Sequence, residues 1–285
     1  MNTARPIETM VLSVLAVLAA VSYYAGLRLP LSVEVGLLAT AVAFLGVPHG
    51  AADARLALYR GLWHSPRGLV IFHGVYVALA ALALLLWWVF PIVGLSSFLL
   101  YSAWHFAGDW REALAPLPRF VVGLAMLSAP CLLFQEQVAF VYQSLAGQDA
   151  AFLSTVQGAI APALLAGGVG VAGLCALKSK RAAGEILLVL ALACLLPPLV
   201  FFALYFCFFH SIRHFRGALE QADQRQDGQF LPWTVGYSFA TLVAATIAVA
   251  LVTDPGHMNT SVLQAVFIGL ACLTVPHMVL MDTRA

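Results

Sequence analysis

The sequence predicts an all-α, polytopic integral membrane helical bundle of about eight to ten transmembrane segments. Of its 285 residues, 62% are hydrophobic and only 9% are charged, whereas a soluble domain normally carries about 25% charged residues. Apolar runs approaching the roughly 20 residues that cross a bilayer recur along the chain. No soluble domain or low-complexity segment separates them, so residues 1–285 are expected to form a single integral membrane domain.

Ten apolar segments are expected as helices. They are 9–27, 32–48, 69–90, 92–107, 119–134, 156–177, 185–196, 198–212, 231–252 and 261–281. The first resembles a signal peptide, because Arg5 precedes the apolar run. The run continues to Leu27, which is long enough to span, and so favours a transmembrane helix.

The number of segments depends on Pro197 and Pro198. Residues 185–209 are either one span kinked by proline or two short segments. Positive residues collect on the cytoplasmic side of membrane proteins. With ten segments and a cytoplasmic N-terminus, only Arg28 of the 14 Lys and Arg residues falls on the other side. The charge distribution therefore favours ten segments, in a multi-pass protein of the inner (plasma) membrane. The net charge of +1 gives no indication of nucleic-acid binding.

Histidines lie in short polar motifs inside these apolar segments. The motifs are PHGAAD with His49, WHFAGD with His105, FHSIRH with His210 and His214, and VPHMVLMD with His277. Ionisable side chains at membrane depth are costly and indicate a functional site, and imidazole is a common metal ligand. A single histidine at a helix end is more often an ordinary interfacial residue. The recurrence of histidine near the cytoplasmic ends of four segments instead predicts a shared metal site.

Spacing within the motifs adds two arguments. His210 and His214 are four residues apart and so share one helix face. Asp53 and Asp109 follow His49 and His105 at the same spacing. Because metal-bound histidines usually donate their second N–H to an acceptor such as a carboxylate, these aspartates are expected to orient a histidine on their own or another helix. Direct ligation by Asp53 or Asp109 is the second choice. Imidazoles without a thiolate suit iron or copper better than structural zinc.

Aromatic residues surround the histidine motifs. Ordinary membrane packing accounts for such residues, and the alternative is a channel for a long apolar substrate that arrives from the bilayer. The candidate substrate-binding residues are Trp104, Phe106, Tyr205, Phe206 and Phe209.

These motifs, in this order from about residue 40 to 282, resemble the Brp/Blh family of membrane β-carotene 15,15′-dioxygenases. The resemblance implies cleavage of the central double bond of β-carotene by O₂, giving two molecules of retinal. It also implies an Fe(II) cofactor, with His49, His105, His210 and His214 as metal ligands and catalytic residues. His277, in Pro276-His277-Met278, is expected to be a further ligand or to contact one. A rhodopsin that accepts retinal is a candidate partner.

Two other functions remain open on the residues alone. A membrane di-iron hydroxylase or desaturase of a lipid or carotenoid also uses embedded histidines. Such enzymes generally have about eight, with HxxHH boxes, and this chain has one HxxxH and no HH pair. A transporter, or a haem protein with bis-histidine ligation, is the non-enzymatic alternative, and broken helices near Pro197 would suit a transporter.

Overall fold

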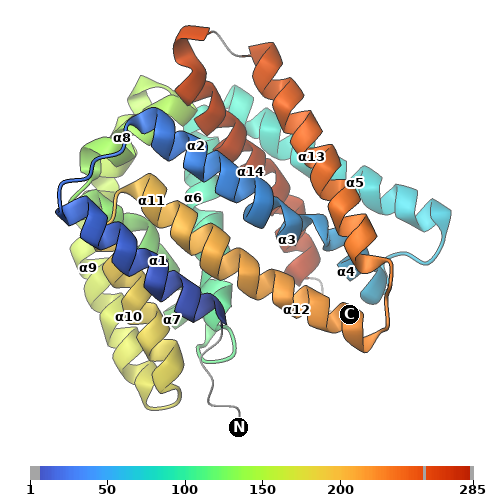
Figure 1. Cartoon of the computed structure of the whole chain (residues 1–285), viewed down its shortest axis with the longest axis horizontal. Helices are drawn as coiled ribbons and strands as arrows, with labels where there is room; N and C mark the ends of the chain where they lie inside the picture. Colours follow the sequence, from blue (N-terminus) through green and yellow to red (C-terminus); the bar gives the residue numbers. More distant parts are fainter. Residues whose placement is uncertain (1–6, 253–254, 283–285) are drawn as a thin grey trace. The chain divides into compact units, whose positions relative to one another are not determined.

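The computed structural model describes residues 7–252 and 255–282, so Arg5 lies outside the described residues. These residues form helices and no strand (Figure 1). The longer helices are α1 (Ile7–Tyr24), α2 (Leu31–Ala41), α5 (Pro66–Val89), α6 (Pro91–Ala107), α7 (Pro116–Ser128), α8 (Gln135–Ala146), α9 (Phe152–Ala176), α10 (Lys180–Leu195), α12 (Ser211–Gln224), α13 (Phe230–Val252) and α14 (Met258–Asp282). Short helical stretches are η1 (Val42–Gly46), α3 (Val47–Ala51), α4 (Asp53–Tyr59), η2 (Gly108–Trp110), η3 (Ala129–Leu132), α11 (Pro198–Phe202) and η5 (Ala203–His210). The predicted all-α membrane architecture is therefore confirmed.

The chain divides into two compact units, each made of two separate segments. The first unit comprises Met1–Pro30 and Pro91–His210, and the second comprises Leu31–Phe90 and Ser211–Ala285. Each unit has its own group of polar residues, described below. The expectation of one integral membrane domain stays a prediction.

In the first unit, α9 packs against α7 and α10, and α7 also packs against α6. Small residues allow this close packing, as is common between membrane helices. A Cβ added to Gly123 of α7 would lie 2.0 Å from the backbone oxygen of Ala103 in α6. A Cβ on Gly168 of α9 would lie 3.0 Å from Leu190. Glycine at 123 therefore sets how closely α6, which carries His105, approaches its neighbour.

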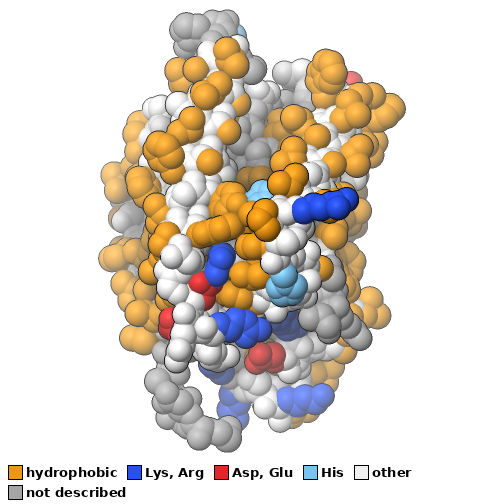
Figure 2. Space-filling view, turned by 90° about the vertical axis from the view of Figure 1, so that its right-hand side faces the viewer, with side chains coloured by type: hydrophobic (Ala, Val, Ile, Leu, Met, Phe, Trp, Pro, Cys, Tyr) orange, Lys and Arg blue, Asp and Glu red, His pale blue; other side chains and the backbone are white. Residues whose placement is uncertain are grey.

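In the second unit, α14 packs against α2, α5 and α13. A hydrophobic cluster joins α4, α12 and the ends of α13 and α14; it consists of Ala52, Leu56, Ala57, Ala218, Ala222, Phe230 and Leu280. By contrast, α5 is apolar on nearly all sides, and Val70 and Trp88 are 71% and 82% exposed. An apolar helix this exposed is suited to contact with lipid. Figure 2 likewise shows hydrophobic side chains over much of the visible face.

Each of the ten predicted segments coincides with a helix, but fewer helices are long enough to span. Among the described residues, seven are long and apolar enough, or eight if the bent pair Pro116–Leu132 and Gln135–Ala146 counts as one span. Eight is the lower end of the predicted range. The shortfall comes from α6, α7 and α10, which have 17, 13 and 16 residues. At 1.5 Å per residue these helices fall short of a hydrocarbon core about 30 Å thick.

The break at the two prolines is present. Helix α10 ends at Leu195 and the next helix begins at Pro198. Leu196 and Pro197 have extended ψ angles of 148° and 143°. Pro198 then occupies the first turn of the next helix, where its missing N–H removes no hydrogen bond. Residues 185–209 thus form parts of two helices, as the charge distribution favoured.

Two helical runs continue beyond the ends that apolarity predicted. The segment expected at 32–48 extends as Leu31–Tyr59, and that expected at 198–212 extends as Pro198–Gln224. His49, His210 and His214 consequently lie within these runs, whereas His105 and His277 lie close to the ends of α6 and α14. The added turns are polar but still amphipathic, since Ala218 and Ala222 are buried on one face of α12. An apolar segment predicts only the part of a helix that lies in lipid. The helix can continue further, for as long as one face still packs against the protein.

Candidate metal centre

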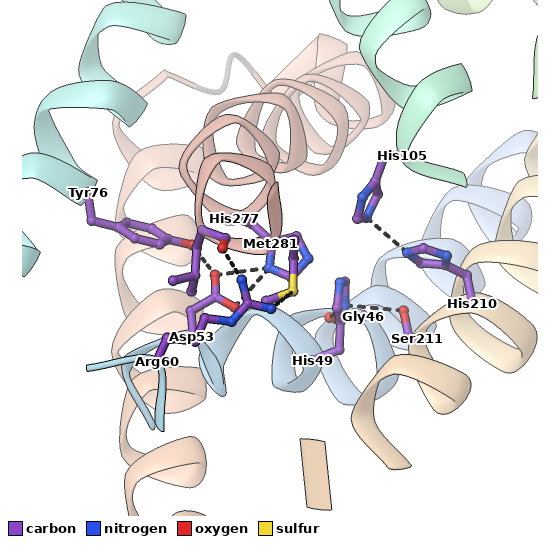
Figure 3. A network of polar contacts seen from close by, with 11 residues as sticks. Gly46, His49, Asp53, Arg60, Tyr76, His105, His210, Ser211, His277 and Met281 are labelled. Atoms are coloured by element: carbon purple, nitrogen blue, oxygen red, sulfur yellow. Dashed lines mark hydrogen bonds and ion pairs between the residues drawn. The ribbon is translucent and has the colours of Figure 1, made fainter. Parts of the chain in front are cut away.

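The first unit contains a buried pair of facing histidines. His105 lies in α6 and His210 at the end of η5, and their Nε2 atoms are 3.0 Å apart (Figure 3). The Nδ1 atom of His210 is 3.1 Å from Oδ1 of Asp109. The side chains of His210 and Asp109 have no exposed surface. Asp109 therefore contacts, and can orient, a histidine on another helix.

Tyr205 contacts the same carboxylate. Its hydroxyl donates to Oδ2 of Asp109 at 2.6 Å, so Tyr205 and His210, five residues apart, meet at one side chain. In a regular α-helix, residues five apart point about 140° away from each other. The chain from Ala203 to His210 is instead a π-helix, whose wider turn brings positions i and i+5 to nearly the same face. This local widening explains how both residues reach Asp109.

The other aromatic candidates divide into two groups. Phe106 is buried and lies 5.0 Å from His210 and 6.1 Å from Phe206, measured between ring centroids. Phe209 is fully buried and lies 6.3 Å from Trp110. Trp104 instead contacts Phe120 and Arg119 of α7. Four of the five predicted substrate-binding residues therefore lie in one aromatic group with His210, in the first unit, and Trp104 packs on α7.

The second unit holds a second histidine group. The ring centroid of His49 is 5.1 Å from that of His277 and 6.1 Å from that of His214. Nitrogen atoms of His49 and His277 lie within 4.8 Å of each other. Nδ1 of His49 is 2.8 Å from the carbonyl oxygen of Gly46 and 3.4 Å from Oγ of Ser211. Like η5, the stretch η1 before His49 is a π-helix, in which the Val47 N–H donates to the Val42 carbonyl.

Asp53 contacts His277, not the histidine four residues before it. Oδ1 of Asp53 is 2.8 Å from Nδ1 of His277, and the Tyr76 hydroxyl donates to Oδ2 at 2.8 Å (Figure 3). Asp53 and His277 are both buried. The Arg60 guanidinium also bonds the backbone oxygen of Leu280 in α14. Helix α14 is thus held against α4 and the residue after it, at His277 and again three residues later at Leu280.

The donor chemistry of both groups fits a metal ion. His49, His210 and His277 each place Nδ1 against an oxygen acceptor, a carbonyl or a carboxylate. A histidine that donates from Nδ1 keeps the Nε2 lone pair for a metal, which is the usual arrangement of metal-bound histidine. The distance of 3.0 Å between Nε2 of His105 and of His210 also equals that of adjacent ligands with metal–nitrogen bonds of about 2.1 Å at right angles.

His73 provides a contrast within the second unit. Its Nδ1 atom is 2.8 Å from the Leu69 carbonyl oxygen, and its Nε2 atom is 2.7 Å from the Tyr237 hydroxyl. Both ring nitrogens are therefore used by protein groups. His73 is thus a structural histidine and a suitable control for experiments on the others.

Sequence reasoning missed two residues of these groups. Tyr76 lies in an apolar helix, and nothing in its local sequence marks it as a partner of Asp53, 23 residues away. Ser211 lies inside the FHSIRH motif but has no spacing relation to His49. Only long-range packing within the second unit brings each of them to its partner.

Comparison with known proteins identifies the family of the chain. Residues 40–283 match the family model described as beta-carotene 15,15'-dioxygenase. A curated relative named beta-carotene 15,15'-dioxygenase, from uncultured marine bacterium 66A03, is 29% identical over 266 residues, covering 85% of this chain and 90% of the relative. No solved structure matches the chain. The family match spans most of the chain and includes every histidine of the two groups, and the chain therefore belongs to the beta-carotene 15,15'-dioxygenase family.

Proposed function

We propose that this chain cleaves β-carotene at its central double bond, using O₂ and an Fe(II) ion bound by His49, His105, His210 and His214. Its family makes it a carotenoid-cleaving dioxygenase, an oxidoreductase. In the proposed reaction the carbon–carbon double bond breaks and each oxygen atom of O₂ ends in one of the two retinal aldehydes. The observation that carries the proposal is the buried His105–His210 pair beside Asp109.

The bound iron would supply the activation of O₂, which no side chain here can perform alone. The residues of the chain have other tasks. Asp109 accepts the Nδ1 proton of His210 and so directs the Nε2 lone pair of that ring toward the metal. The Gly46 carbonyl does the same for His49.

The surroundings of His210 suit an apolar polyene. Phe106 and Phe206 lie against its ring, and neither offers a hydrogen bond to a substrate. A hydrocarbon needs none, because its affinity comes from burial of apolar surface. We propose that Phe106, Tyr205, Phe206 and Phe209 contact the substrate or the histidines next to it. Because the substrate dissolves in the bilayer, the protein is expected to act in the inner (plasma) membrane, and a rhodopsin remains a candidate acceptor of the retinal.

The test is expression of the chain in a bacterial host that accumulates β-carotene, with chromatography of the extract and metal analysis of the purified protein. Retinal at the expense of β-carotene, with one iron per chain, is expected. His105→Ala and His210→Ala should lose both retinal and iron, while His73→Ala should keep both. Two irons per chain with hydroxylated product would favour the hydroxylase. A purified protein without metal or turnover would refute the proposal and favour a transporter.

A further inference from the structure

Each unit contains the same buried sequence of contacts, from a tyrosine to an aspartate to a histidine. In the first unit, Tyr205 donates to Asp109, which faces Nδ1 of His210. In the second unit, Tyr76 donates to Asp53, which faces Nδ1 of His277. The residues of the two sets come from different helices, and beyond the two aspartates, which each follow a histidine by four residues, they share no sequence pattern. Their common geometry therefore points to a common task.

The chemistry of the three groups defines that task. A carboxylate in an apolar environment rotates unless its second oxygen is held, and the tyrosine hydroxyl holds it. The fixed carboxylate then accepts the proton of Nδ1, which selects the tautomer with an electron pair on Nε2. This is the tautomer that binds metal through Nε2. For His73, by contrast, a backbone carbonyl faces Nδ1 and a tyrosine hydroxyl already occupies Nε2.

The location of His277 supports a ligand role. The ring centroid of His277 is 5.1 Å from that of His49, whereas the ring centroid of His214 is 6.1 Å from that of His49. Nitrogen atoms of His277 and His49 also lie within 4.8 Å of each other, close enough to share one ion. His277 is 4% exposed, so the cost of burying its polar ring is offset by the aspartate and by a metal.

We infer that His277 binds the same metal as His49, and that Tyr76 and Tyr205 are positioning residues that act through Asp53 and Asp109. This inference rests on the proposed iron site. It extends that site by one ligand and by two tyrosines that do not themselves touch the metal.

The test measures metal affinity, not turnover alone. Purified protein in detergent is stripped with a chelator and titrated with Fe(II), and with Co(II), whose visible absorption reports the ligand set. The variants are Asp53→Asn, Tyr76→Phe, Tyr205→Phe and His277→Gln. Matched controls are Tyr237→Phe in the second unit, whose hydroxyl bonds His73, and Tyr142→Phe in the first, whose hydroxyl bonds Gln157.

Asp53→Asn is expected to weaken metal binding about 10–100-fold, as loss of a carboxylate partner of a metal-bound histidine does. The reason is specific: if Tyr76 still donates to the amide oxygen, the amide NH₂ faces Nδ1 and favours the wrong tautomer. Tyr76→Phe and Tyr205→Phe should weaken binding about 3–10-fold, the effect of one lost hydrogen bond. His277→Gln should change the Co(II) spectrum, and both control variants should match the wild type in affinity and spectrum.

The outcomes separate this inference from the proposed function. If the wild type binds iron and forms retinal, but Asp53→Asn, Tyr76→Phe and His277→Gln bind metal like Tyr237→Phe, the inference is wrong and the function stands. If the wild type itself binds no iron and forms no retinal, the function fails first. Should Asp53→Asn not fold, Tyr76→Phe tests the Tyr76–Asp53–His277 contacts in its place, because it removes one oxygen atom and keeps the ring.

Discussion

Replacing Gly123 by alanine tests whether the close packing of α6 and α7 determines the position of His105. The added Cβ would lie 2.0 Å from the Ala103 backbone oxygen, whereas ordinary contact begins at 3.4 Å. The two helices would have to separate locally by about 1.4 Å, because a backbone oxygen cannot rotate away as a side chain can. Ala103 lies one helical half-turn before His105, so His105, a proposed metal ligand, should move with it.

The cost can be worked out from two opposing effects. Overpacking costs about 1–3 kcal/mol, and a clash with backbone belongs at the upper end. Alanine in place of glycine within a helix recovers about 1 kcal/mol. A net loss of about 2 kcal/mol corresponds to a decrease of about 4–8 °C in unfolding temperature for a chain of this size. The bound iron should fall as well.

The assay is thermal unfolding of the purified protein in detergent, followed by metal analysis. Gly173→Ala is the matched control, because a Cβ there meets nothing within 4 Å. Gly167→Ala should be intermediate, since its Cβ would meet only the Val121 side chain, at 3.1 Å. Equal unfolding temperatures for Gly123→Ala and Gly173→Ala would refute the packing argument.

Three further outcomes are expected. Burial alone raises the pKa of Asp227, but hydrogen bonds from Arg55 and Tyr59 outweigh it and hold that pKa below its ordinary value of 3.8. This stabilisation is therefore complete above pH 3.8 and is lost as the pH falls through the lowered pKa. In Asp227→Asn the unfolding temperature should fall less steeply as the pH drops below 3.8 than in the wild type. An unchanged slope would contradict the assignment. Ser65→Ala removes the cap in which the Ser65 hydroxyl accepts the Gly68 N–H, and should cost about 1 kcal/mol in unfolding experiments, against no loss for Ser65→Asp. Chelation should abolish retinal formation, and Fe(II) but not Zn(II) should restore it; full activity in the stripped protein would exclude a metal.

Composition and local pattern were enough to predict the membrane class and ten helical segments, but not α8, whose residues Gln135–Ala146 are less apolar. Apolarity depends on residue type, and a helix satisfies every backbone hydrogen bond of a long apolar segment within that segment. The break before Pro198 was one of two alternatives, and the distribution of positive charge favoured it; proline alone did not decide, since Pro162 and Pro276 lie inside helices. The histidine motifs were predictable, because polar residues are conspicuous in apolar segments.

Tertiary structure alone decided which partners meet. The spacing of His49 with Asp53, and of His105 with Asp109, was consistent with pairs on one helix, but the structure pairs Asp53 with His277 and Asp109 with His210. The π-helix that lets Tyr205 and His210 share Asp109 was not predicted from the sequence, since the contacts that it brings together join residues about 100 positions apart. The contact of Tyr76 with Asp53 could not be predicted for the same reason. A hydrogen bond between residues distant in sequence forms only once the helices have packed.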